Sequence, residues 1–219
     1  MRRAVICFTR VPRPGMTKTR LLPVLSPEQC AELHTAFLKD LARVYRDLDA
    51  GLFVAYAPDP DWASLKDMFP MAEELFPQAG EGLGERMDGA IRHVLSLGFE
   101  RVVLTGTDLP EMGREHLESG FSALDHSDVV LGPTPDGGYY LVGTKAPCTA
   151  VFRDQQYGGG SVYENTRMAA EKAGLSLGRA LACGDVDTPE DLERLVCQAD
   201  PESHTGRFLA TLKKEGYLL

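Results

Sequence analysis

The sequence predicts a single three-layer α/β domain, with a mixed but mainly parallel sheet covered by helices on both faces. Two observations lead to this fold class. Short apolar segments typical of buried strands alternate with helical segments of about 10 to 15 residues, which is the pattern of βαβ units. Between Leu131 and Tyr139, however, two predicted strands follow each other without a helix. One strand pair is therefore expected to be antiparallel, because so short a connection cannot join parallel strands.

The first strand and the first helix are the most clearly marked elements. An uninterrupted apolar run predicts a buried strand over residues 4–8. Ser26 is followed by a proline and, three positions on, by Gln29, which indicates a capped helix start. Apolar residues then recur at helical spacing along one face: Cys30, Leu33, Phe37, Leu41, Val44 and Leu48. Gly51 ends this segment, and a second buried strand is predicted over residues 52–57.

The rest of the chain continues the same alternation. Further strands are predicted over residues 74–76, 101–105, 128–131 and 138–143. Further helices are predicted over residues 62–68, from the Gly-rich turn at 80–84 to Gly98, and over 115–124, 161–173, 188–199 and 205–215. No repeat or low-complexity linker divides the sequence, so we expect one domain over residues 1–219.

The charge balance and the cysteines exclude several classes of protein. The 23 Lys and Arg residues stand against 32 Asp and Glu, a net charge of −9, which argues against nucleic-acid binding through general positive charge. A small phosphorylated ligand needs only a local basic cluster and is still allowed. The five cysteines form no C-x-x-C pair, and no segment approaches the ~18 apolar residues of a membrane span. We therefore expect a soluble, cytoplasmic protein with reduced thiols.

The loop after the first strand has the composition of a phosphate-binding loop. In open α/β sheets ligands bind beyond the carboxyl ends of the strands, where this loop must lie. It combines Gly15 with four basic side chains, Arg10, Arg13, Lys18 and Arg20. It is not a Walker A loop, because Thr17 stands where that motif requires glycine. The alternative is a solvated basic loop.

Carboxylates lie next to three other predicted elements. Asp108 comes directly after the strand at 101–105, where one carboxylate can bind Mg²⁺ or Mn²⁺ or cap a turn. Asp136 precedes two glycines in a predicted hairpin turn, which also allows close approach of a substrate. Thr188 begins a capped helix, and this helix start leaves Asp185 and Asp187 unexplained.

The Gly-rich segment 80–84 is not a dinucleotide fingerprint. Glu85 occupies the position where G-x-G-x-x-G requires its third glycine, and the segment follows the third strand rather than the first. A nicotinamide site is therefore not expected here. The sequence also shows no Ser-His-Asp or Cys-His arrangement.

Taken together, these five segments resemble one family. They are similar to the bacterial proteins with an A-type glycosyltransferase (GT-A) fold long catalogued as a domain of unknown function, some described as glycosyltransferases of arsenosugar biosynthesis. The resemblance runs from residue 3 to about residue 197 and rests on Pro14-Gly15-x-x-Lys18-Thr19-Arg20-Leu21, Gly82-Leu83-Gly84-x-Arg86-Met87, Gly106-x-Asp108-x-Pro110, Gly132-Pro133-x-x-Asp136-Gly137-Gly138-Tyr139-Tyr140 and Asp185-Val-Asp187-Thr188-Pro189-x-Asp191-Leu192.

The resemblance implies a nucleotide-diphospho-sugar transferase fold. It extends, more distantly, to phospholactate guanylyltransferases and molybdopterin nucleotidyltransferases. By that resemblance Lys18 would bind the phosphates, Asp108 and Asp187 would hold the metal ion, and the stretch 78–84 would lie against the base. The residues implied in nucleotide or phosphate binding are Gly15, Lys18, Arg20, Gln78, Gly84 and Arg86.

Two departures from the family pattern bear on substrate and metal. Most A-type glycosyltransferases carry D-x-D after the fourth strand, where this chain has only Asp108. The family often shows Trp-Gly/Ser-Thr before the late helix, where residues 157–161 read Tyr-Gly-Gly-Gly-Ser.

The function expected first is that of a Mg²⁺- or Mn²⁺-dependent glycosyltransferase with a nucleotide-diphospho-sugar donor and a small-molecule acceptor. Asp136 is the candidate that orients or deprotonates the acceptor hydroxyl. The alternative is a nucleotidyltransferase that uses a nucleoside triphosphate and a phosphorylated acceptor and releases pyrophosphate. A third interpretation is a nucleotide-binding module without catalysis. The single carboxylate at Asp108 favours it slightly, whereas Lys18, Asp136 and Asp187 argue against it.

Overall fold

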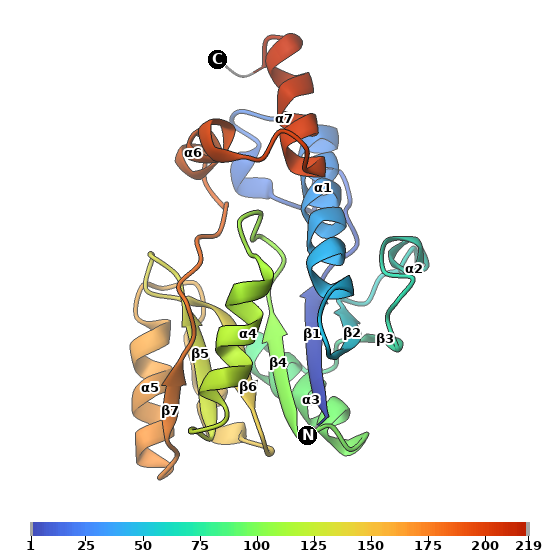
Figure 1. Cartoon of the computed structure of the whole chain (residues 1–219). Coiled ribbons are helices and arrows are strands. Elements are labelled where there is room, and N and C mark those ends of the chain that lie inside the picture. The colour runs from blue at the N-terminus through green and yellow to red at the C-terminus, as the bar shows by residue number, and fades with distance from the viewer. Residues whose placement is uncertain (1, 218–219) are drawn as a thin grey trace.

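The computed structural model describes residues 2–217 and confirms the predicted fold class. Seven strands form one sheet in the order β3-β2-β1-β4-β6-β5-β7 (Figure 1). The strands are β1 (Arg3–Thr9), β2 (Gly51–Tyr56), β3 (Glu74–Pro77), β4 (Arg101–Thr105), β5 (Val129–Pro133), β6 (Tyr139–Thr144) and β7 (Leu177–Arg179). All pair in parallel except β6, which runs antiparallel to both β4 and β5. The short connection between residues 131 and 139 is therefore a hairpin, as predicted.

The helices lie where the sequence patterns place them. They are α1 (Pro27–Arg46), α2 (Ser64–Met68), α3 (Leu83–Ser96), α4 (Arg114–Ala123), α5 (Val162–Lys172), α6 (Pro189–Gln198) and α7 (His204–Lys214). The predicted capping box of α1 is present, with the Gln29 main-chain N–H donating to Ser26 Oγ over 3.2 Å. Three short elements have no counterpart in the prediction: β7 and the 3₁₀ turns η1 (Thr19–Leu21) and η2 (Thr149–Val151).

Alternating side chains of the central strands divide the core between the two faces of the sheet. Val5 and Cys7 of β1 belong to the cluster formed with α1, α2 and α4. Ala4 and Ile6 point the other way, into the cluster formed with α3 and residues of α5. Both faces are thus covered, which explains why the strands read as continuous apolar runs.

A third apolar cluster lies beyond the carboxyl ends of the strands. There α6 and α7 pack against the first half of α1, above the sheet in Figure 1. Leu209 and Leu212 of α7 are buried in this cluster, together with Leu21 and Leu25 from the segment before α1. The apolar side chains of α7 therefore pack on the chain's own core. This cluster holds two segments, η1 and the start of α6, against the sheet edge.

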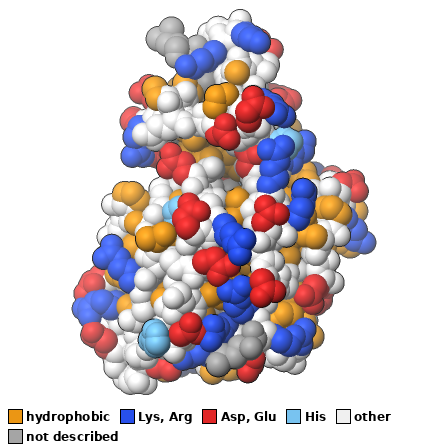
Figure 2. All heavy atoms as spheres, in the orientation of Figure 1, with side chains coloured by type: hydrophobic (Ala, Val, Ile, Leu, Met, Phe, Trp, Pro, Cys, Tyr) orange, Lys and Arg blue, Asp and Glu red, His pale blue; other side chains and the backbone are white. Residues whose placement is uncertain are grey.

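The cysteines, the surface charges and the helix lengths bear on the expectations from composition. Cys7, Cys30, Cys148 and Cys183 are buried, Cys197 is exposed, and all five are free thiols. Figure 2 shows acidic and basic side chains interspersed over the visible face rather than gathered by sign. Within residues 2–217, no helix combines the length and the apolar character needed to cross a bilayer.

Candidate active site

The loop after β1 turns the Lys18 side chain into the protein. Gly15 has a φ of 74° with open space around its Cα, so glycine serves the turn itself. Lys18 has a φ of 53°, in the left-handed region, which costs a non-glycine residue about 1–2 kcal/mol. In this conformation its side chain is only 3% exposed. Backbone strain that places a buried charge is typical of a functional position.

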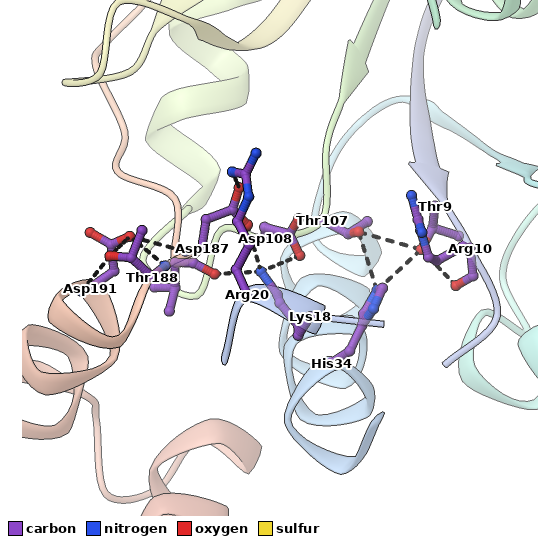
Figure 3. Close-up of polar contacts among 11 residues, drawn as sticks. Thr9, Arg10, Lys18, Arg20, His34, Thr107, Asp108, Asp187, Thr188 and Asp191 are labelled. Carbon is purple, nitrogen blue, oxygen red and sulfur yellow. Dashed lines mark hydrogen bonds and ion pairs between the residues drawn. The ribbon is translucent and has the colours of Figure 1, made fainter. Parts of the chain in front are cut away.

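The Lys18 ammonium joins three segments that are far apart in the sequence (Figure 3). Lys18 Nζ lies 2.5 Å from Asp108 Oδ1 and 3.4 Å from Asp187 Oδ1. It also donates to the Val186 main-chain oxygen over 2.5 Å. An ammonium group has three N–H donors, so these three oxygens fill its hydrogen-bonding capacity. The structure thus brings together the first loop and both carboxylates predicted to hold a metal.

The two carboxylates are held by the elements that precede or follow them. Asp108 lies in the loop after β4, and its main-chain oxygen accepts from the Val186 N–H over 2.9 Å. Asp187 precedes α6, where the Asp191 carboxylate accepts from the main-chain N–H groups of Asp187 and Thr188 over 3.1 and 2.9 Å. The predicted capping box of α6 therefore also fixes the backbone that carries Asp187.

The oxygen set around Lys18 fits a divalent ion. Two carboxylates and a main-chain carbonyl converge on one point, and such hard oxygen ligands are what Mg²⁺ and Mn²⁺ prefer, with positions left for phosphate oxygens. Burial acts to raise the pKa of Asp108, but the charges of Lys18 and His34 outweigh it and hold the pKa below its usual range. Across residues 2–217 no group of three or more His, Cys, Asp and Glu side chains is placed to hold a metal ion.

Basic side chains line a cavity of about 200 Å³ on one side of this cluster. Arg10, Lys18 and Arg20 border it, and Arg20 also forms an ion pair of 3.1 Å with Asp187. Arg13, in contrast, turns away and pairs with Asp59 and Asp61 over 2.6 Å. The sequence placed all four cations in one phosphate-binding loop, and Arg13 departs from that prediction because two carboxylates after β2 hold it.

A second cavity, of about 220 Å³, opens on the other side of Asp108. Asp136 and Asp185 line it, as do Phe8, Leu83 and other apolar residues. Asp136 Oδ1 accepts from Thr134 Oγ1 over 2.5 Å and from the Gly138 N–H over 3.0 Å, so it closes its own turn. Burial, and then the charges of Asp187, Asp136 and Asp108, raise the pKa of Asp185 to about 6.

Three other predicted residues lie apart from the Lys18 cluster. Gln78 is buried and donates its amide to the main-chain oxygens of Thr9 and Ala55 over 2.9 and 3.0 Å. Gly84 lies so close to the main chain at Phe152 that a Cβ would collide with its oxygen. Arg86 is half-buried and donates to the Gly80 oxygen over 2.9 Å. Of the stretch 78–84 only Leu83 lines the second cavity, and its contact with a base stays a prediction.

His34 is the residue that sequence reasoning missed. It lies on α1, is 3% exposed, and borders the basic cavity. Its Nε2 is 3.4 Å from Thr9 Oγ1 and 3.3 Å from Thr107 Oγ1, so it links the ends of β1 and β4. Its Nδ1 is buried and has no hydrogen-bond partner among the described residues. Burial lowers the pKa of His34 to about 4, against an opposing effect of Asp108.

Comparison with known proteins gives the same picture as the geometry. A protein of Desulfovibrio desulfuricans G20, whose crystal structure carries a provisional designation as a nucleotide-diphospho-sugar transferase, superposes with a TM-score of 0.90 and 31% identity over all of both chains. The 2-phospho-L-lactate guanylyltransferase of Methanothermobacter thermautotrophicus is 26% identical, over 90% of this chain and 85% of that protein. The phosphoenolpyruvate guanylyltransferase of Sphaerobacter thermophilus is 26% identical, over 89% and 93%.

The fold and the site therefore define a transferase of the nucleotide-diphospho-sugar transferase superfamily. Residues 40–159 match the model of the family described as uncharacterized proteins conserved in bacteria (DUF2064), and the chain belongs to this family. This confirms the resemblance drawn from the five sequence motifs.

Proposed function

We propose that this chain is a metal-dependent nucleotidyltransferase, which transfers a nucleoside monophosphate from a triphosphate to a phosphorylated small molecule and releases pyrophosphate. The observation that carries the proposal is the convergence of Asp108, Asp187 and Lys18 on one point at the border of the basic cavity. The Methanothermobacter and Sphaerobacter relatives are both named as guanylyltransferases, and they support this function over glycosyl transfer, which the sequence placed first.

The charges of the basic cavity suit a phosphate chain. Arg10, Lys18 and Arg20 carry three positive charges there, and Asp108 and Asp187 carry two negative charges. A divalent ion would bring the sum to about plus three, which can balance a triphosphate or a nucleotide diphosphate. The named relatives, and not this charge balance, favour the triphosphate.

Transfer consists of one displacement at the α-phosphorus. An oxygen of the acceptor phosphate forms a bond to that phosphorus, the bond to the bridging oxygen breaks, and pyrophosphate leaves with the electron pair. A bound Mg²⁺ or Mn²⁺ would supply neutralisation of the charge that develops on the phosphates. Lys18 and Arg20 act on the same charge from the first loop. Asp108 and Asp187 would hold the ion, and Lys18 would exchange one of its present oxygen partners for a phosphate oxygen.

The test measures two products in parallel. Each nucleoside triphosphate is incubated with Mg²⁺ or Mn²⁺ and phosphomonoester acceptors, and pyrophosphate is assayed. Nucleotide-diphospho-sugars are incubated with the same acceptors, and nucleoside diphosphate is assayed. We expect metal-dependent pyrophosphate release that Asp108→Asn abolishes, whereas Asp154→Asn, an exposed carboxylate outside the cluster, leaves it unchanged. Release of nucleoside diphosphate alone would replace this proposal with glycosyl transfer.

Binding can be measured before any acceptor is known. A ligand at 100 times its dissociation constant stabilises a protein by roughly 2.7 kcal/mol, which thermal unfolding detects. We expect a triphosphate to raise the unfolding midpoint in the presence of Mg²⁺ and to raise it much less in EDTA. No metal-dependent shift with any triphosphate would contradict the proposed function.

A further inference from the structure

Asp108 divides the cleft into two halves of different chemistry. One half is the basic cavity, bordered by Arg10, Lys18 and Arg20. The other half is the second cavity, and its only charged lining residues are Asp108, Asp136 and Asp185. None of the described residues that line it is Lys, Arg or His. The two halves share Asp108, so a molecule bound in the second half lies next to the phosphates bound in the first.

Lys18 is the cation next to the second cavity, and it already has partners. Its Nζ contacts carboxylate oxygens of Asp108 and Asp187 and donates to the Val186 main-chain oxygen. A divalent ion held by Asp108 and Asp187 would be neutralised by those two carboxylates and by the phosphates. Asp136 and Asp185 would then remain as two carboxylates without a countercharge.

The proposed reaction does not need these two carboxylates as bases. A phosphomonoester has its second pKa near ~6, so its attacking oxygen carries no proton at neutral pH. Asp136 and Asp185 nevertheless line the space beside the reacting phosphates. Ionised carboxylates only accept hydrogen bonds, so this end of the cavity is built to receive donors. Hydroxyl and ammonium groups are donors, and a carboxylate is not.

Resting on the proposed function, we propose that the acceptor is a phosphomonoester whose remaining part is neutral or cationic and presents hydroxyl or ammonium groups to Asp136 and Asp185. A carboxylate on the acceptor would face both Asp side chains and be repelled, since like charges brought together at a binding site oppose association. This chain would then differ in acceptor from proteins that use phospholactate or phosphoenolpyruvate, while it shares their reaction.

The experiment compares small phosphomonoesters that differ in charge. Outside the phosphate group, phosphoethanolamine carries an ammonium and glycerol 3-phosphate carries only neutral hydroxyl groups. Phosphoenolpyruvate and 2-phospho-L-lactate each carry a carboxylate. Thermal unfolding is measured with each in the presence of Mg²⁺ and a non-hydrolysable triphosphate analogue, and pyrophosphate release is measured with the triphosphate itself. We expect the cationic or the neutral compound to bind and react with a kcat/KM larger by on the order of 10-fold or more.

Variants test whether the two carboxylates cause the preference. Asp185→Asn and Asp136→Asn should each lower the ratio of kcat/KM for phosphoethanolamine over that for phosphoenolpyruvate by about 5- to 10-fold. Asp154→Asn removes a carboxylate that borders a different cavity and should leave the ratio unchanged. The comparison of ratios separates acceptor recognition from a general loss of activity.

Two outcomes would overturn this inference while the proposed function stands. One is binding or reaction of either carboxylate compound equal to or better than that of the other two. The other is a triphosphate analogue that stabilises the protein with Mg²⁺ although no neutral or cationic phosphomonoester adds to the effect. If the analogue itself gives no metal-dependent stabilisation, the proposed function fails first, and the two failures are therefore distinguishable.

Discussion

The two halves of the cleft are assembled in different ways. On the phosphate side, which is the half with the basic cavity, Lys18 is buried. Its partners come from the loop after β4 and the segment before α6. On the acceptor side, which is the half with the second cavity, Asp136 is exposed. Its hydrogen bonds stay within its own turn, with Thr134 and Gly138. The Lys18 arrangement exists only when the chain has folded, whereas the turn that carries Asp136 is made by neighbouring residues. Changes at Lys18 and its partners should therefore affect stability and catalysis together, and a change at Asp136 should affect specificity alone.

The largest effect is expected from Asp108→Asn. The amide keeps the shape of the side chain but removes the charge that holds Lys18 and would hold the ion. Loss of one preorganised electrostatic interaction in an active site lowers kcat by about 10²–10³-fold, and weaker binding of the ion adds to this loss. The measurement is pyrophosphate release as a function of Mg²⁺ concentration.

A matched variant on the acceptor side sharpens this prediction. Asp136→Asn should keep the Mg²⁺ dependence of the wild type and change only the preference among acceptors. If both variants shifted the Mg²⁺ dependence equally, the two halves would not be separate, and the comparison would be wrong.

The sequence predicts features made by neighbouring residues better than it predicts contacts between distant segments. The caps of α1 and α6 and the turn at Asp136 were predicted because each is encoded by neighbouring residues. Lys18, Asp108 and Asp187 could be nominated, because all follow or precede predicted elements at the ligand-binding edge. Their contact with one another depends on how the sheet and α6 come together, which no local pattern encodes.

The features that the sequence did not predict also depend on distant residues or lack a clear local pattern. The direction of Arg13 is set by Asp59 and Asp61, which lie in another loop. The role of His34 depends on Thr9 and Thr107 at the ends of two strands. A histidine on a helix face has no sequence signal that separates it from an ordinary core residue. The strand β7 is only three residues long and partly exposed, so it lacks an apolar run.

The next largest effect is expected on stability, from Lys18→Met. Methionine keeps the length of the side chain but leaves Asp108 without its cation and Asp187 with Arg20 as its remaining ion-pair partner. Removing one partner of a fully buried pair costs about 3–5 kcal/mol. The two carboxylates are 41% and 35% exposed, so water reduces this to about 2–3 kcal/mol. Denaturant unfolding measures the difference.

Addition of Mg²⁺ distinguishes the loss of a charge from poor packing in the same variant. If the ammonium stands where the ion would bind, Mg²⁺ alone should raise the unfolding midpoint of Lys18→Met more than that of the wild type. Ca²⁺ and Na⁺ at matched ionic strength are the controls. An equal rise in both proteins would show that Asp108 and Asp187 do not hold the ion together.

His34 makes the phosphate side sensitive to acid. Its pKa is about 4 in the folded protein and about 6.5 when unfolded. The unfolded state binds more protons between these values, so stability falls as the pH falls from about 6.5 towards 4, by roughly 2 kcal/mol. Asp108 opposes this effect, and Lys18 and Arg10 add to it.

His34→Gln tests this contribution, because glutamine does not titrate. The unfolding free energy of the variant should change less between pH 6.5 and 4.5 than that of the wild type. His126→Gln, at a histidine exposed after α4, should leave the pH dependence unchanged. Equal slopes for wild type and His34→Gln would mean that His34 is not the group responsible.

The smallest effect separates two arginines of the same loop. Arg20 is 66% exposed and makes its ion pair with Asp187 at the basic cavity, whereas Arg13 is held by Asp59 and Asp61 outside it. Arg20→Gln should weaken triphosphate binding by about 3- to 10-fold, less so at high salt. Arg13→Gln should leave that affinity unchanged and lower stability only slightly, because its ion pairs are exposed to water. Isothermal titration calorimetry measures both affinities. An equal loss in both variants would show that the cavity depends on the order of the whole loop, because Arg13 has no direct path to the phosphates.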